Sequence, residues 1–113
     1  MADDERRARI GRNEAIFREV NERMEELNRG FAEMSDRMLH VVCECGNSTC
    51  VEQLVISIDG YEEVRGDSTH FLVRPGHQMP SAEDVIAERE GYLIVRKQSG
   101  LPAQIARESD PRS

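Results

Sequence analysis

The chain has 113 residues with 22 acidic and 15 basic side chains, and its formal net charge of −7 disfavours binding to a nucleic-acid backbone. It contains no apolar run long enough to cross a bilayer, and its charged start lacks the apolar core of a signal peptide, so we expect a cytoplasmic protein without membrane contact. Aromatic residues make up only 4% of the chain, which leaves little apolar surface to offset the entropy lost on folding and favours a metal ion as an added stabilising element.

Residues 1–37 predict one long amphipathic helix. They contain no proline and are rich in strong helix formers. Apolar residues recur at a spacing of seven, as in a coiled coil, and the predicted partner-binding stripe comprises Ile10, Phe17, Val20, Met24, Leu27 and Phe31. A helix of about 30 residues is roughly 45 Å long, which is more than a small domain covers, so we expect part of the stripe to contact a protein partner or a second copy of the chain. The alternative is that the whole stripe packs within the chain.

Glutamate and arginine residues four positions apart predict stabilising pairs on the outer face of this helix. Glu14–Arg18 and Glu19–Arg23 have the favourable order, in which the acidic residue comes first. Each such pair contributes about 0.2–0.5 kcal/mol to helix stability. We interpret single Asp and Glu residues throughout the chain as solvated surface groups.

Residues 38–98 predict a small β-rich domain with one short helix. Residues 38–43 and 51–58 have strand character and flank a turn, and residues 57–65 resemble a capped helix of about two turns. Further strands are expected at 71–73, 84–88 and 92–97, with the last two forming a hairpin. The expected core residues of that hairpin are Val85, Ile86, Leu93 and Val95. Residues 99–113 are expected to form a flexible tail, although residues 103–108 can form a brief helix.

All three cysteines lie within eight positions, as Cys43, Cys45 and Cys50, and this clustering predicts three ligands of a zinc site. The glycine that follows Cys45 is expected to take the left-handed conformation of a tight metal-binding loop. His77, in a turn flanked by prolines, is the preferred fourth ligand, because such a turn can approach the tip of the cysteine hairpin.

His70, His40, and a water molecule or carboxylate are the alternatives for the fourth position. Three thiolates and one imidazole form a closed site that holds structure and leaves no open position for catalysis. Ordinary reduced cysteines and thiol redox chemistry are the competing interpretations of the cluster. The acidic neighbours Glu44 and Glu52 oppose the low thiol pKa that redox chemistry requires.

Several segments of the chain resemble a group of short uncharacterised proteins from high-GC Gram-positive bacteria, the actinobacteria. The resemblance spans about residues 6–97 and rests on Arg12–Arg23, Cys43-Glu44-Cys45-Gly46, Cys50, Tyr61–Arg65, Phe71 and Pro75-Gly76-His77. It implies one coherent module without an established activity. Zinc-binding anti-sigma factors are a weaker comparison, because they carry H-x3-C-x2-C where this chain has His40-x2-Cys43-x-Cys45.

These patterns together predict an α+β protein that acts as a non-enzymatic, zinc-binding interaction or regulatory module. No glycine-rich phosphate loop, Ser/His/Asp set or paired carboxylates stand out in the sequence. One alternative is a transcription-linked regulator that contacts RNA polymerase, a sigma factor or DNA through the arginine-rich segment 6–12. The other is a thiol-based redox sensor.

Overall fold

The computed structural model describes residues 2–33, 38–47 and 49–112, and within the first helix it describes the side chains of residues 5, 6 and 8–27. The elements follow in the order α1 (Ala2–Glu33), β1 (Met38–Val42), β2 (Gln53–Ser57), α2 (Ile58–Arg65), β3 (His70–Val73), β4 (Glu83–Arg89), β5 (Tyr92–Lys97) and α3 (Leu101–Glu108). The predicted α+β class, with a long helix at the start of the chain, is therefore confirmed. No helix in these described ranges is both long enough and apolar enough to cross a membrane.

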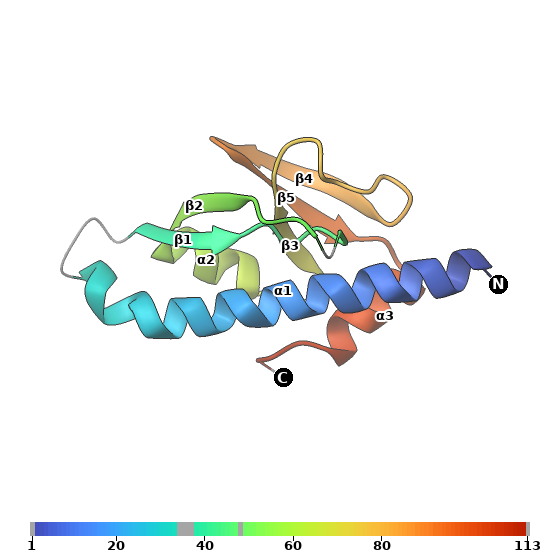
Figure 1. Ribbon diagram of the computed structural model, residues 1–113, viewed down its shortest axis with the longest axis horizontal. Helices are drawn as coiled ribbons and strands as arrows, with labels where there is room; N and C mark the ends of the chain where they lie inside the picture. Colours follow the sequence, from blue (N-terminus) through green and yellow to red (C-terminus); the bar gives the residue numbers. More distant parts are fainter. Residues whose placement is uncertain (1, 34–37, 48, 113) are drawn as a thin grey trace.

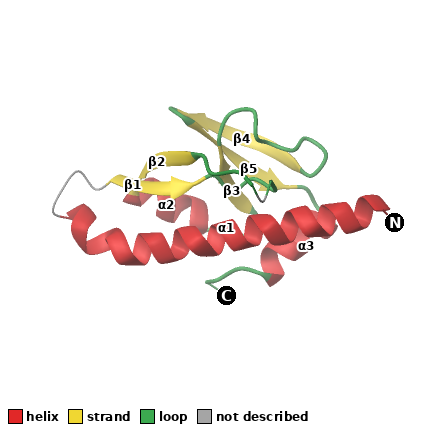
Figure 2. Cartoon of the chain, in the orientation of Figure 1, coloured by secondary structure: helices red, strands yellow, loops and turns green. Residues whose placement is uncertain are grey.

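The strands form two small antiparallel sheets. β1 pairs with β2 as the predicted hairpin, and β5 lies between β3 and β4 in the second sheet. Figure 1 shows α1 running along the length of the molecule beside both sheets, with α3 next to its N-terminal half. The secondary-structure colouring in Figure 2 shows the two sheets lying on the same side of α1.

Two groups of buried apolar side chains form the core. One joins the β1–β2 hairpin to α2 and comprises Leu39, Val41, Leu54, Ile56, Ile58, Tyr61, Val64 and Leu72. The other joins the second sheet to α3 and to the cysteine loop, and comprises Cys43, Cys45, Phe71, Val73, Leu93, Val95 and Ala106. The cysteines therefore lie at the edge of the core, where a bound ion would extend it.

The helix α1 packs against the rest of the chain with a polar face. Glu14, Arg18, Asn21 and Glu25 on this face are all buried, with at most 4% of each residue exposed. Our interpretation of acidic residues as solvated groups is therefore wrong for Glu14 and Glu25, and also for Glu44 and Glu83 elsewhere in the chain. The predicted outer-face pair Glu14–Arg18 lies on this buried face, whereas the exposed pair Glu19–Arg23 forms at 3.2 Å.

Arg18 connects α1 to two distant parts of the chain. Its guanidinium donates hydrogen bonds to the backbone carbonyls of Ser68 at 2.6 Å and Ala106 at 2.8 Å. The same group lies over the ring of Phe71, 4.6 Å from the ring centroid. These contacts fix α1 against α3 and against the turn before β3.

Lys97, at the end of β5, bonds to the carboxylates of both Glu14 and Glu83 in a buried cluster. Burial raises the pKa of Glu14 to about 8, although Lys97 opposes the shift. One lysine thus forms ion pairs with two carboxyl groups. The raised pKa favours a proton on Glu14 at neutral pH. With this proton, the net charge of the cluster is close to zero.

Glu44 binds three elements at once. Its Oε1 accepts hydrogen bonds from the Arg65 guanidinium at 2.6 Å and from the Leu72 backbone N–H at 3.0 Å. Its Oε2 accepts from the Asn21 side chain at 2.7 Å. The carboxylate therefore joins α1, α2 and β3, because Asn21, Arg65 and Leu72 belong to these three elements.

The segment 99–113, which we expected to be a flexible tail with at most a brief helix at 103–108, contains α3, and this helix is docked on the fold. Ala103 and Ala106 of this helix are buried, and α3 lies against α1. Arg112 then forms ion pairs with Glu22 on α1 and Glu62 on α2. A short helix whose buried residues are alanines gives a weak apolar signal, which explains why the sequence did not predict its docking.

Two of the four core residues expected in the β4–β5 hairpin are not core residues. Val85 and Ile86 are each 41% exposed, because β4 is an outer strand of its sheet and its ladder is interrupted by a register shift between Val85 and Ala87. Leu93 and Val95 on the central strand β5 are buried as predicted.

The Glu44→Gln variant tests the buried pair with Arg65. We expect it to lower the free energy of unfolding by about 3–5 kcal/mol, because it leaves the Arg65 charge buried and uncompensated. The matched control Glu19→Gln removes an exposed pair with Arg23 and should cost about 0–1 kcal/mol. Urea unfolding in saturating zinc measures the free energy of unfolding of both variants. Equal effects of the two substitutions would contradict the description of the Glu44–Arg65 pair as a buried ion pair.

Candidate metal centre

The structure brings the side chains of Cys43, Cys45, Cys50 and His77 together. Their potential ligand atoms, three sulfurs and one ring nitrogen, all lie within 4.8 Å of one another. Cys43 and Cys45 follow β1, Cys50 precedes β2, and His77 lies in the turn between β3 and β4. The cluster thus joins the tip of one sheet's hairpin to a turn of the other sheet, and it can hold a metal ion.

Two sulfur–nitrogen separations inside the cluster are close to the edge of a coordination tetrahedron. Nδ1 of His77 lies 3.7 Å from the Cys43 sulfur and 3.5 Å from the Cys50 sulfur. A tetrahedral zinc ion with Zn–S bonds of about 2.3 Å and Zn–N bonds of about 2.0–2.1 Å holds sulfur and nitrogen about 3.5 Å apart. These two separations are therefore compatible with one small tetrahedral ion, and all four potential ligand atoms lie within 4.8 Å of one another.

Backbone hydrogen bonds hold the cysteine loop in place. The Cys43 N–H donates to the Glu52 carbonyl at 2.9 Å, which extends the β1–β2 pairing toward the cluster. The Cys50 N–H donates to the Asn47 carbonyl at 3.0 Å and closes a tight turn. The side-chain oxygen of Asn47 also accepts from the Thr49 N–H at 3.0 Å. The loop is thus shaped by its own turn-forming residues.

The histidine turn reaches the cysteines by similar means. The His77 N–H donates to the Arg74 carbonyl at 2.9 Å, and Gly76 at the bend has a φ of 93°, a conformation that favours glycine. The Arg74 N–H in turn donates to the Cys43 sulfur at 3.3 Å. A backbone N–H directed at a sulfur stabilises the thiolate that a metal requires.

Without a metal, burial keeps Cys43 and Cys45 protonated. Burial raises the pKa of Cys43 to about 12 and raises the pKa of Cys45 as well. Thiolates are the reactive and metal-binding form of cysteine, so Cys43 and Cys45 are poor nucleophiles at neutral pH in the metal-free protein. Metal binding must therefore release protons from these thiols, which makes metal affinity increase with pH.

The glycine after Cys45 has a role that differs from our prediction. Among the described glycines, only Gly76, Gly91 and Gly100 have a positive φ, so Gly46 is not in the left-handed conformation. A Cβ atom at Gly46 would lie 2.2 Å from Cγ2 of Ile10 on α1. Gly46 therefore permits close contact between the cysteine loop and the long helix, and Asn13 supports this contact by donating to the Gly46 carbonyl at 3.2 Å.

The other two histidines lie outside the cluster. His70 Nε2 is 3.5 Å from a carboxylate oxygen of Asp67. His40 is exposed on β1. Of the three candidates, His77 is the one that the fold places beside the cysteines.

The residues predicted for partner contact lie in different environments along α1. Leu27 is 75% exposed and Val20 is 39% exposed, and the neighbouring Ile16, which the prediction omitted, is 58% exposed. The half-buried members are Ile10, Phe17 and Met24. The side chain of Phe31 lies outside the part that the structure describes.

Comparison with known proteins identifies no relative of this chain: no protein-family model, no curated protein and no solved structure matches it. The function must therefore be inferred from the site itself.

The Gly46→Ala variant tests the contact between the cysteine loop and α1. We expect it to destabilise the fold by about 1–3 kcal/mol, because a methyl group at this position overlaps the β-branched side chain of Ile10. In an Ile10→Ala background the same substitution should cost less than about 1 kcal/mol, since the overlapping atoms are gone. Urea unfolding of the four proteins of this cycle measures the coupling. Additive effects of the two substitutions would show that the contact is not the reason for a glycine here.

Proposed function

We propose that this protein is a non-enzymatic interaction module whose fold is held by a structural zinc ion on Cys43, Cys45, Cys50 and His77. The observation that carries the proposal is the convergence of three sulfurs and one ring nitrogen within 4.8 Å of one another, with the ring nitrogen 3.5 and 3.7 Å from two of the sulfurs. The ion would join the β1–β2 hairpin to the β3–β4 turn, which otherwise belong to separate sheets. It would thereby add to the second group of buried core side chains, which already includes Cys43 and Cys45.

The chemistry of the ligands favours zinc and a structural role. Thiolate ligands with one imidazole in a tetrahedral arrangement are typical of zinc sites, and reduced cysteines are available for metal binding in the cytoplasm. Four protein ligands saturate a tetrahedral zinc ion and leave no position for water or substrate. This saturation supports a structural assignment over a catalytic one.

The exposed apolar face of α1 supports a role in protein contacts. Ile16, Val20 and Leu27 lie along one side of the helix, since their spacings of four and seven residues return to the same face. In contrast, the face that packs on the chain's own sheets is polar. We therefore assign this apolar stripe to a second copy of the chain or to another protein, and a second copy is the simplest occupant to test.

Metal analysis tests the zinc assignment. We expect one zinc ion per chain in protein purified without chelator, and a lower melting temperature after chelation, because the ion stabilises only the folded state. His77→Ala should lower zinc affinity by more than about 100-fold, since the loss of a second-shell group alone costs 10–100-fold. His70→Ala is the matched control and should leave affinity unchanged.

Cobalt substitution adds a spectroscopic measurement. Cobalt(II) bound at this site should show the visible absorption of a tetrahedral thiolate centre, and Cys43→Ser should change that spectrum. Stoichiometric binding that survives His77→Ala but not His70→Ala would refute the proposed ligand set. Protein that binds no zinc at neutral pH would refute the structural-zinc function itself.

Light scattering tests the helix face. We expect the average mass of the wild-type protein to rise above that of one chain as concentration increases, because dimerisation would cover the apolar stripe. Ile16→Ser with Leu27→Ser should restore the mass of one chain without altering the zinc content. The control Glu19→Ser with Glu26→Ser changes neighbouring exposed positions on the same helix. A single-chain mass at every wild-type concentration would contradict self-association.

A further inference from the structure

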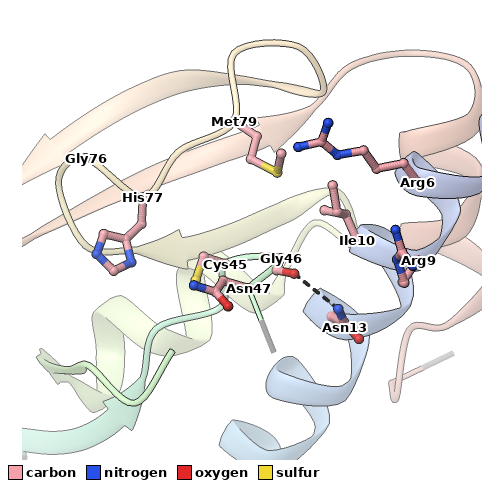
Figure 3. A pocket seen from close by; sticks show the side chains of 10 residues that line it. All are labelled: Arg6, Arg9, Ile10, Asn13, Cys45, Gly46, Asn47, Gly76, His77 and Met79. Carbon is pink, nitrogen blue, oxygen red and sulfur yellow. Dashed lines mark hydrogen bonds between the residues drawn. The ribbon is translucent and has the colours of Figure 1, made fainter. Parts of the chain in front are cut away.

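A hollow of about 690 Å³ lies beside the cysteine–histidine cluster, between the start of α1 and the turn before β4. Figure 3 shows the side chains of Arg6 and Ile10 on the helix side, with Met79 facing them and His77 farther along the turn. Its volume lies within the range of about 300–1,000 Å³ that is usual for small-molecule sites. It is large enough for an organic molecule and far larger than a single inorganic ion needs.

The charge of this hollow is opposite to that of the protein. None of its lining residues is acidic, although the chain carries 22 acidic residues. Arg6 and Arg9 lie three residues apart on α1, so both guanidinium groups project from neighbouring positions of one helix face. In the part of the chain that the structure describes, neither group has an ion-pair or hydrogen-bond partner.

The positive charge persists when a metal occupies the adjacent cluster. A divalent ion with three thiolates and a neutral imidazole carries one net negative charge. The two arginines carry two positive charges, so the hollow and the metal centre together keep a net positive charge. Charge complementarity therefore favours a negatively charged occupant whether or not the cluster is filled.

The remaining walls of the hollow suit the uncharged part of an anionic organic molecule. Ile10 and Met79 provide apolar surface, and Met79 directs its thioether into the hollow (Figure 3). Asn47 contributes a donor, because its oxygen already accepts from the Thr49 backbone and hydroxyl, which leaves its NH₂ group for a ligand. The hollow thus combines cationic donors with an apolar wall and suits a ligand that has both an anionic and an apolar part.

We infer that this hollow binds a small organic phosphate, with the phosphate on Arg6 and Arg9 and the organic part against Ile10 and Met79. Guanidinium groups recognise phosphate through paired, charge-assisted hydrogen bonds, which makes arginine well suited to this ligand class. The inference goes beyond the proposed structural zinc, since it assigns a ligand to residues that do not hold the ion. Cys45 and His77, two of the proposed zinc ligands, also line the hollow, so the ion would shape one of its walls.

Calorimetric titration of the zinc-loaded full chain tests the inference, with adenosine monophosphate and phenyl phosphate as probes. We expect saturable binding of at least one probe that weakens as salt concentration rises. Arg6→Gln with Arg9→Gln should weaken this binding by about tenfold or more, because each lost charge-assisted bond is worth about 1.5–3 kcal/mol, or about tenfold or more in affinity. Arg23→Gln with Arg89→Gln, at exposed positions away from the hollow, is the matched control and should have no effect.

Three outcomes would overturn the inference. The first is the absence of saturable binding of either probe at millimolar concentration, and the second is equal binding by the double-arginine variant and wild type. The third is tight binding of a single-stranded oligonucleotide with no measurable binding of the small probes, which would assign the arginines to nucleic acid instead. Zinc content measured on the same samples separates these results from a failure of the zinc site. An Arg6→Gln/Arg9→Gln protein that keeps its zinc and loses the phosphate would support both assignments.

Discussion

The carboxylate of Glu44 is the constraint on which the rest of this structure depends. It lies between two candidate metal ligands in an extended segment, so Cys43 and Cys45 face one side while Glu44 faces the other. On that other side it binds groups from α1, α2 and β3, and its pair with Arg65 is buried. The position of the sulfurs is therefore fixed by a buried charge as well as by the turns that carry them.

A chain with few aromatic residues must obtain specificity from other interactions. Buried ion pairs contribute little net stability, because desolvation offsets their attraction, but their geometry is strict. Arg18, Asn21 and Glu14 all need their particular partners, and a helix shifted by one residue would leave buried charges unpaired. The polar layer thus determines where α1 lies, while the apolar groups and the proposed ion supply the favourable free energy. This division explains how the apolar side of the helix can remain exposed.

Much of the element order was predictable from sequence, because the helix formers of residues 1–37 and the apolar strands differ clearly in pattern. The convergence of His77 with the three cysteines was also predictable, since clustered cysteines and a proline-flanked turn limit the choices. The face of α1 that packs against the rest of the chain was not predictable from sequence. Residues 14, 18, 21 and 25 repeat with the same heptad spacing as the apolar stripe, and periodicity alone cannot tell which stripe faces the fold. The close contact of Gly46 with Ile10 was also hidden, because it depends on a residue far away in the sequence.

The bond from Arg18 to the Ala106 carbonyl spans 88 positions of the chain, and it affects how the molecule is made. During synthesis the long helix is made before the acceptor that fixes it. At about 5–20 residues per second, a ribosome needs roughly 4–18 s to add the intervening residues. During that interval the nascent helix lacks α3, so its docking is completed only after Ala106 has left the ribosome. The newly made helix is thus exposed to chaperones, or to a neighbouring nascent chain, before its contacts with its own domain are complete.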